Sequence, residues 1–92
     1  MKIAGSETSI VEQWEFIDKM VTTNEQGKRI DWLIRNYLRK VATDESGWEV
    51  LYVDPEDGRV WELTFPNSEM QGGGPRLLML ISKKDASAKY IF

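Results

Sequence analysis

The chain has 92 residues and a formal net charge of −3, and 41% of its residues are hydrophobic. This length predicts one domain over residues 1–92, and four tryptophans with that apolar fraction favour a folded chain over a disordered one. Neither cysteine nor histidine occurs, which excludes a disulfide framework, a thiolate metal site and any nucleophile paired with histidine, so we expect no cofactor and no metal.

Residues 10–21 fit two structures. Ile10, Trp14 and Phe16 fall on one face of a strand, but Ile10 and Trp14 with Ile17 and Val21 also fit the spacing of a helix. Because β-branched and aromatic residues are enriched here, we favour a strand. We predict that the chain turns at residues 18–19 into a second short strand at 20–22.

The next segment is predicted to be an amphipathic helix from about residue 24 to 42. Thr23 and Gln26 form a capping-box pattern at its start. Apolar residues then follow at spacings of three and four, so they share the core-facing side of the helix. These residues are Ile30, Leu33, Ile34, Tyr37, Leu38 and Val41.

Residues 48–65 predict a β-hairpin whose turn contains Pro55 and Gly58, since proline presets φ and glycine accepts the left-handed conformation. A loop at 55–58 pairs 52 with 61, 50 with 63 and 48 with 65. One face then carries Trp48, Val50, Tyr52, Trp61, Leu63 and Phe65, which should cover the helix. The other face is expected to point outward, with Glu49, Leu51, Val53, Val60, Glu62 and Thr64.

Residues 66–75 are predicted to be a loop with three consecutive glycines. These glycines do not fit a phosphate-binding loop, because they lead into a strand and no Lys-Ser or Lys-Thr follows. Five apolar residues at 77–81 indicate a strand buried on both faces, and Ser82 then caps a short helix that ends near Tyr90. The fold class is therefore α+β: a small, mainly antiparallel sheet of about five strands on one long amphipathic helix, with a short C-terminal helix.

Two features have both a functional and a structural interpretation. Glu49 and Glu62 share a hairpin face and could form a carboxylate pair for acid–base chemistry, but charges on an outward strand face usually serve solvation. Trp32 lies on the outer helix face among Lys28, Arg35 and Arg39. It is either an interface anchor or a ring packed beneath the N-terminal segment.

Charge is segregated along the chain. Residues 43–69 contain eight acids against Arg59, a net charge of −7, whereas residues 28–40 carry +4. A segment this acidic disfavours nucleic acid as the partner and favours a basic protein. We predict partner contacts in the loops at 44–47 and 66–75, and the candidate residues are Asp44, Glu45, Asp54, Glu56, Asp57 and Glu69, with Trp32 as the next choice.

The N-terminus predicts neither a secretion signal nor a membrane anchor, because Glu7 and Glu12 interrupt it early. No stretch approaches the roughly 20 apolar residues of a membrane-spanning helix. We therefore expect a cytoplasmic protein without membrane contact, and we favour a monomer.

Several short motifs occur in order between about residues 10 and 90. They are Arg29-Ile30-Asp31-Trp32-Leu33, Gly47-Trp48-Glu49-Val50-Leu51-Tyr52, Asp54-Pro55, Asp57-Gly58-Arg59, Trp61-Glu62-Leu63, Gly72-Gly73-Gly74-Pro75, Ile81-Ser82 and Lys89-Tyr90. In order and spacing they resemble the bacterial immunity protein 27 family.

This resemblance implies an antitoxin that binds a cognate toxin domain and protects the producing cell and its siblings. It implies no catalytic residues. The density of acidic residues favours a basic, nuclease-type toxin as the partner. The alternatives are an adaptor domain within a larger assembly and, less favoured, a hydrolase that uses carboxylates.

Overall fold

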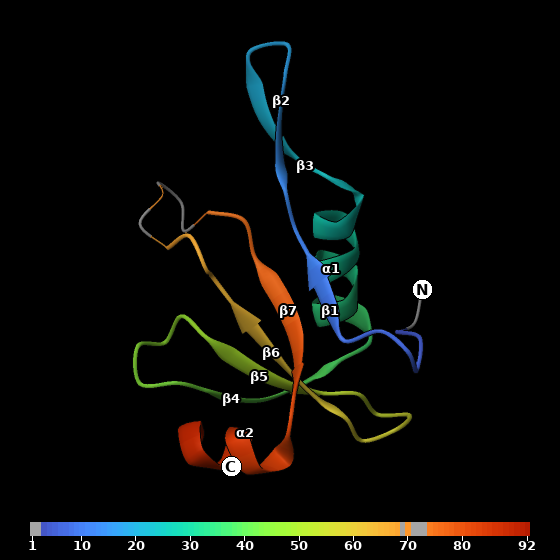
Figure 1. Ribbon diagram of the computed structural model, residues 1–92, viewed down its shortest axis with the longest axis vertical. Helices are drawn as coiled ribbons and strands as arrows, with labels where there is room; N and C mark the ends of the chain where they lie inside the picture. Colours follow the sequence, from blue (N-terminus) through green and yellow to red (C-terminus); the bar gives the residue numbers. More distant parts are fainter. Residues whose placement is uncertain (1–2, 69, 71–73) are drawn as a thin grey trace.

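The computed structural model describes residues 3–68, 70 and 74–92, and it has the expected α+β architecture (Figure 1). A five-stranded antiparallel sheet has the order β1-β7-β6-β5-β4, and a separate two-stranded hairpin is formed by β2 and β3. The strands are β1 (Ser9–Val11), β2 (Trp14–Ile17), β3 (Met20–Thr23), β4 (Arg39–Thr43), β5 (Val50–Val53), β6 (Val60–Thr64) and β7 (Leu77–Ile81).

Helix α1 (Glu25–Asn36) packs on one face of the sheet and forms the main core with it. Ile30 and Leu33 of α1 are fully buried, and Ile34 packs against the same core. The core also contains Ile3, Ile10, Leu38, Tyr52, Trp61, Leu63 and Leu78.

The predicted extent of this helix was wrong, because α1 ends at Asn36 and not near residue 42. The backbone N–H groups of Tyr37 and Leu38 both donate to the carbonyl of Leu33, and this closes the helix. Leu38 still reaches the main core, whereas Val41 lies in β4 and packs in a second cluster on the opposite face of the sheet. The helical spacing of apolar residues in the sequence therefore continues beyond Asn36, although the backbone leaves the helix there.

The predicted capping residue was also displaced by one position. Asn24 caps α1, and its side-chain oxygen accepts a hydrogen bond from the Gly27 N–H at 3.0 Å. The Thr23 hydroxyl donates instead to the Glu12 carboxylate at 2.6 Å. The chain before α1 is thus tied to the end of β1 by a side-chain hydrogen bond.

The β5–β6 hairpin has the predicted register, with Tyr52 opposite Trp61 and Val50 opposite Leu63. Gly58 takes a positive φ of 75° in the turn, as expected. The prediction that its second face points outward was wrong, because helix α2 (Lys83–Lys89) covers that face. Leu51, Val60, Ala86 and Tyr90 are buried there in the second cluster.

Strand β7 and the cap of α2 lie where the sequence predicted, but β7 is less completely buried than expected. Leu78 is fully buried, and its neighbours in β7 are half-buried. The Ser82 hydroxyl accepts from the Asp85 N–H at 3.0 Å. Gly74 has a φ of 72°, and a Cβ there would lie 2.6 Å from the Asn67 carbonyl oxygen; Gly72 and Gly73 lie outside the described residues.

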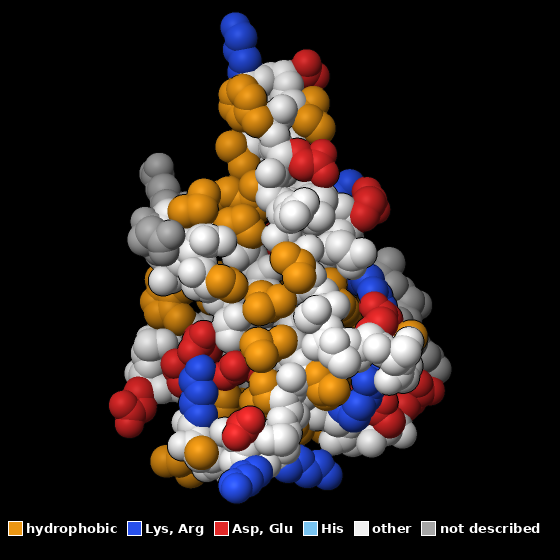
Figure 2. Space-filling view, viewed as in Figure 1, with side chains coloured by type: hydrophobic (Ala, Val, Ile, Leu, Met, Phe, Trp, Pro, Cys, Tyr) orange, Lys and Arg blue, Asp and Glu red, His pale blue; other side chains and the backbone are white. Residues whose placement is uncertain are grey.

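The β2–β3 hairpin confirms the strand interpretation of the N-terminal segment, with its turn at Asp18 and Lys19. It projects from the body of the molecule and lies at one end of the longest dimension, which measures 43 Å (Figure 1). Figure 2 shows apolar side chains along this projection. Neither helix in the described part of the chain is long and apolar enough to cross a membrane.

An ion-pair network around the buried carboxylate of Glu12 anchors the base of this hairpin. Arg76 donates to both carboxylate oxygens of Glu12 at 3.0 Å, and to Asp31 of α1 at 2.6 Å. Burial opposes ionisation of Glu12, but the hydrogen bonds from Arg76 and Thr23 outweigh it and lower the pKa of Glu12 to about 2. Strand β1, helix α1 and the segment before β7 are therefore held at one point.

Candidate functional site

The acidic residues predicted to bind a partner lie at the two opposite ends of β5. Asp44 and Glu45 precede β5 in the β4–β5 loop, whereas Asp54, Glu56 and Asp57 form the turn that follows it. The two groups are on different sides of the molecule in Figure 1. Glu69 lies outside the described residues. The structure therefore divides what the sequence presented as one acidic segment.

The turn after β5 uses its carboxylates internally. Asp54 is only 1% exposed, and it accepts hydrogen bonds from the Tyr37 hydroxyl at 2.6 Å and the Glu56 N–H at 2.8 Å. The Tyr37 hydroxyl also donates to Glu56, and the bond to Asp54 is the main reason that the pKa of Tyr37 is raised. Asp54 therefore stabilises the turn and offers no surface to a partner.

Asp57, in the same turn, is neutralised by Arg59. The guanidinium Nε of Arg59 lies 2.6 Å from the carboxylate, and the Arg59 N–H donates to it at 3.0 Å. The backbone hydrogen bond and the guanidinium together lower the pKa of Asp57. Arg59 also reaches the carbonyls of Ala4, Gly5 and Glu7, which fixes the N-terminal segment. This end of β5 presents less negative charge than the sequence suggests.

The β4–β5 loop has a different architecture, centred on Asp44. Its carboxylate accepts from the Ser46 hydroxyl at 2.7 Å, and from the N–H groups of Gly47 and Glu49 at 3.1 and 3.3 Å. Gly47 has a φ of 78°, which only glycine adopts without strain. The hydrogen bond from Ser46 is the largest cause of the lowered pKa of Asp44. Asp44 thus stays ionised while it shapes the loop.

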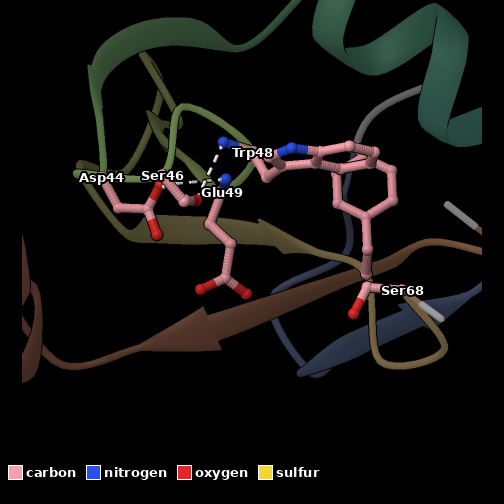
Figure 3. A pocket seen from close by; sticks show the side chains of 6 residues that line it. Asp44, Ser46, Trp48, Glu49 and Ser68 are labelled. Atoms are coloured by element: carbon pink, nitrogen blue, oxygen red, sulfur yellow. Dashed lines mark hydrogen bonds between the residues drawn. The ribbon is translucent and has the colours of Figure 1, made fainter.

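An open pocket of about 470 Å³ lies beside this loop, and Figure 3 shows its lining. Trp48 and Ser68 are on one side of it, and the carboxylates of Asp44 and Glu49 are on the other. Trp48 is 53% exposed, although its ring packs edge-on against Phe65 with centroids 5.4 Å apart. The hairpin register that places 48 beside 65 therefore builds an aromatic wall next to an acidic one.

Glu45 and Glu49 differ in how available they are. Glu45 is exposed and makes no hydrogen bond or ion pair within the described part of the chain. Glu49 is half-buried and forms an ion pair with Lys89 of α2. Asp44 and Trp48 line the pocket, and the exposed Glu45 follows Asp44 in the chain and borders a neighbouring hollow beside α2. We call these three residues the acidic–aromatic edge.

Glu49 and Glu62, which were considered as a possible carboxylate pair but expected to serve solvation, form a structural cluster. Lys89 bridges the two carboxylates and lies 2.8 Å from Glu62, which also accepts from the Tyr90 hydroxyl at 2.7 Å. Burial lowers the pKa of Lys89, but the hydrogen bonds to both glutamates outweigh it, so the net shift is upward. Burial, with the bond to Glu62, raises the pKa of Tyr90. Glu62 is only 7% exposed. The expectation that its side chain faces solvent was therefore wrong.

Trp32 is 38% exposed on α1, on the far side of that helix from the buried Ile30 and Leu33. Arg39, which was expected beside it on the helix, belongs to β4, and Lys28 pairs with Glu25. The structure does not bring Trp32 together with the acidic–aromatic edge. Among the described residues, no group of three or more acidic side chains is arranged to hold a metal ion.

The sequence missed one exposed feature. Phe16, Ile17, Met20 and Val21 are all at least half exposed on the β2–β3 hairpin. The signal was present, because apolar residues on both sides of a short hairpin cannot all face one core. The sequence predicted two short strands here, and the exposure of both faces was not predicted.

A comparison with known proteins gives the family. No curated protein and no solved structure matches the chain. The protein-family model described as Immunity protein 27 matches residues 16–82, which run from β2 to the N-cap of α2 and include the whole acidic–aromatic edge. Since this match covers well over half of the 92 residues, the chain belongs to the immunity protein 27 family.

Proposed function

We propose that this protein neutralises a cognate bacterial toxin domain in the cytoplasm by binding it, and that the acidic–aromatic edge is part of the contact surface. The family supports the immunity role. The observation that carries the site is the half-exposed Trp48 in an open pocket beside Asp44, with the exposed Glu45 next to Asp44 in the same loop. Tryptophan is enriched at the energetic centres of interfaces.

The chemistry of this edge favours a basic partner. A guanidinium or ammonium group can lie over an indole face and, in the same position, bond to a carboxylate. Asp44 remains ionised because its pKa is lowered, and Glu45 is exposed. A nuclease-type toxin carries arginine and lysine to bind phosphate, so its surface is complementary to this edge.

The mode of action that fits is inhibition by binding, without catalysis. The two carboxylates that could have formed an acid–base pair are both held by Lys89, and one of them is buried beneath Tyr90. These contacts attach α2 to the sheet. The glutamates are therefore better explained as structural residues.

The test is the association rate with the toxin domain encoded next to the gene for this chain, measured by stopped flow across a salt series. Glu45→Lys should slow association about tenfold at low salt and flatten the salt dependence, because it reverses an exposed charge. Trp48→Ala should act mainly by raising the dissociation rate.

The matched control is Glu25→Lys, which makes the same charge change on α1, where Glu25 forms an exposed ion pair with Lys28. It should behave as wild type apart from a small effect of net charge. If wild-type protein binds the toxin and both edge variants bind equally well, the contact surface is elsewhere. If wild-type protein does not bind the toxin at all, the immunity function itself is wrong.

A further inference from the structure

The β2–β3 hairpin exposes four large apolar side chains at its tip. Phe16 is 73% exposed, Met20 69%, Val21 60% and Ile17 50%. The pairs Phe16–Val21 and Ile17–Met20 are directly opposite across the two strands. Side chains of directly opposed residues share a face, and neighbouring pairs alternate between faces. The hairpin tip is therefore apolar on both faces.

The fold gives no reason for this exposure. The main core closes on Ile3, Ile10 and the residues of α1 and the sheet, without these four side chains. A two-stranded hairpin is only marginally stable by itself, and exposed apolar residues do not improve it. The Glu12–Arg76–Asp31 network nevertheless holds the base of the hairpin firmly against the body of the molecule. This arrangement presents the tip to a binding partner.

The surface that would cover the tip is itself apolar. The turn carries one acid and one base, Asp18 and Lys19, so it has no net charge. Because both faces of the ribbon are apolar, a flat surface would cover only one of them. A cleft that encloses the ribbon would cover both, and its walls would be apolar.

The hairpin is continuous with the acidic–aromatic edge. Trp14, Val21 and Thr23 line a hollow with Met70, which is 44% exposed. Ser68, two residues before Met70, lines the pocket beside Trp48. Figure 1 shows residues 65–68, which follow β6, lying between the hairpin and the β4–β5 loop. One partner can therefore contact both surfaces.

We propose that the β2–β3 hairpin inserts into an apolar cleft of the same toxin domain that the acidic–aromatic edge contacts. This proposal rests on the proposed function. A second copy of this chain is the weaker choice, because four side chains offer only a few hundred Å². A stable interface buries about 800 Å² on each partner, so the hairpin tip needs a further contact surface, and the edge is the surface continuous with it.

The experiment compares two double variants, one for each face of the hairpin: Phe16→Thr with Val21→Thr, and Ile17→Thr with Met20→Thr. Threonine keeps the strand preference while it removes the large apolar group. The matched control is Ile91→Thr with Phe92→Thr, since these C-terminal residues are 99% and 61% exposed. The readouts are the dissociation constant for the adjacent-gene toxin domain, its salt dependence, and the mass of the free chain by light scattering.

Each face variant should weaken toxin binding roughly 100-fold, mostly through faster dissociation, with the salt dependence kept as in wild type. The control should bind as wild type. Circular dichroism and urea unfolding should show that all variants retain the sheet, because the four side chains lie outside both clusters.

Three results would overturn the proposal. If only one face variant loses affinity, the hairpin lies on a flat surface and does not enter a cleft. If both variants bind toxin as wild type, and the free chain is a dimer that they dissociate, the occupant is a second copy. If both bind as wild type and the chain is a monomer, the hairpin has no binding role while the immunity function stands. Absence of toxin binding by wild-type protein would instead refute the immunity function and this proposal together.

Discussion

The two hairpins of this protein both carry apolar residues on both faces, but their environments are opposite. In β5–β6, one face packs beneath α1 and the other beneath α2, so Leu51 and Trp61 are both fully buried. In β2–β3, Phe16 and Ile17 also point to opposite faces, yet both are exposed. Apolar residues on both faces therefore predict a hairpin in each case. They do not predict whether the rest of the fold or a binding partner covers those faces.

The turns differ in the same way. The β5–β6 turn places Gly58 at a positive φ and satisfies its carboxylates within the chain. The β2–β3 turn places two non-glycine residues, Asp18 and Lys19, at φ values of 51° and 64°. Lysine in the left-handed region is strained. The hairpin that builds the core has the more favourable turn, and the hairpin that projects retains strain, as functional segments often do.

The largest contrast should appear on truncation of one aromatic residue in each hairpin. Trp61→Ala should lower the free energy of unfolding by about 3–5 kcal/mol, because it empties a fully buried position. Phe16→Ala should change it by less than about 0.5 kcal/mol, since the ring is mostly solvated. Urea unfolding measures both values. A loss above about 1 kcal/mol for Phe16→Ala would mean that the ring already packs within the fold.

The same contrast explains what the sequence could predict. The register of β5–β6 followed from Trp48, Tyr52, Trp61 and Phe65, because a one-residue slip would have moved every aromatic ring to the other face. The sequence did not predict that helix α2 covers the second face of this hairpin. The apolar contacts of α2 come mainly from Ala86, with Tyr90 just after the helix, so this short helix resembles a solvated one.

The end of α1 was unpredictable for a related reason. Leu38 and Val41 both become buried or half-buried, but they do so on different faces of the sheet. Because both residues are apolar and fall at helical spacing, the predicted helix was extended over what is in fact strand β4. Within the site, the contact between Trp48 and Phe65 was predictable from the hairpin register. The burial of Asp54 was not, because it depends on a hydrogen bond from the Tyr37 hydroxyl, whose position the local sequence does not predict.

The anchor of the projecting hairpin should show the next largest effect, and it should depend on pH. The pKa of Glu12 is lowered from 4.5 to about 2, so its contribution is fully present above pH 4.5 and is lost as the pH falls toward 2. Glu12 is 4% exposed, and this contribution amounts to about 3 kcal/mol.

Glu12→Gln tests this contribution directly. The variant should be less stable at neutral pH, and its stability should fall less steeply than that of wild type between about pH 4.5 and 2. Urea unfolding at a series of pH values gives both slopes. Identical slopes for the two proteins would show that Arg76 does not stabilise the ionised carboxylate.

Gly27 should be intolerant of alanine even though it lies within α1. A Cβ at this position would lie 1.7 Å from the Thr23 hydroxyl oxygen and 2.4 Å from a Glu12 carboxylate oxygen. Gly27→Ala should therefore cost about 1–2 kcal/mol, whereas alanine usually stabilises a helix interior by about 1 kcal/mol. Gly5→Ala is the control, because no heavy atom lies within 4 Å of its added Cβ. A stabilised Gly27→Ala variant would show that the anchor shifts freely, and it would weaken the rigid presentation of the hairpin.

The smallest effect should come from relieving the strained turn of the projecting hairpin. Lys19→Gly replaces a side chain at a φ of 64° with the residue that adopts this conformation most readily, and Asp-Gly is a preferred pair for a two-residue hairpin turn. We expect a local gain of about 0.5–1 kcal/mol. Because this hairpin contributes little to either core cluster, the gain should slow amide exchange within β2 and β3 and leave the global unfolding midpoint nearly unchanged.

Two further variants separate backbone strain from charge in this turn. Lys19→Ala removes the same charge but keeps a side chain at positive φ, so it should not slow exchange. Gly58→Ala makes the reverse change at a φ of 75° in the other hairpin, with no atom near the added Cβ, and it should lower global stability by about 1 kcal/mol. Backbone strain in the turn would then affect only local stability in β2–β3 but global stability in β5–β6.

If Lys19→Ala slowed amide exchange as much as Lys19→Gly, the charge of Lys19 and not its backbone conformation would be the source of the slower exchange. The two turns would then differ in electrostatics and not in strain.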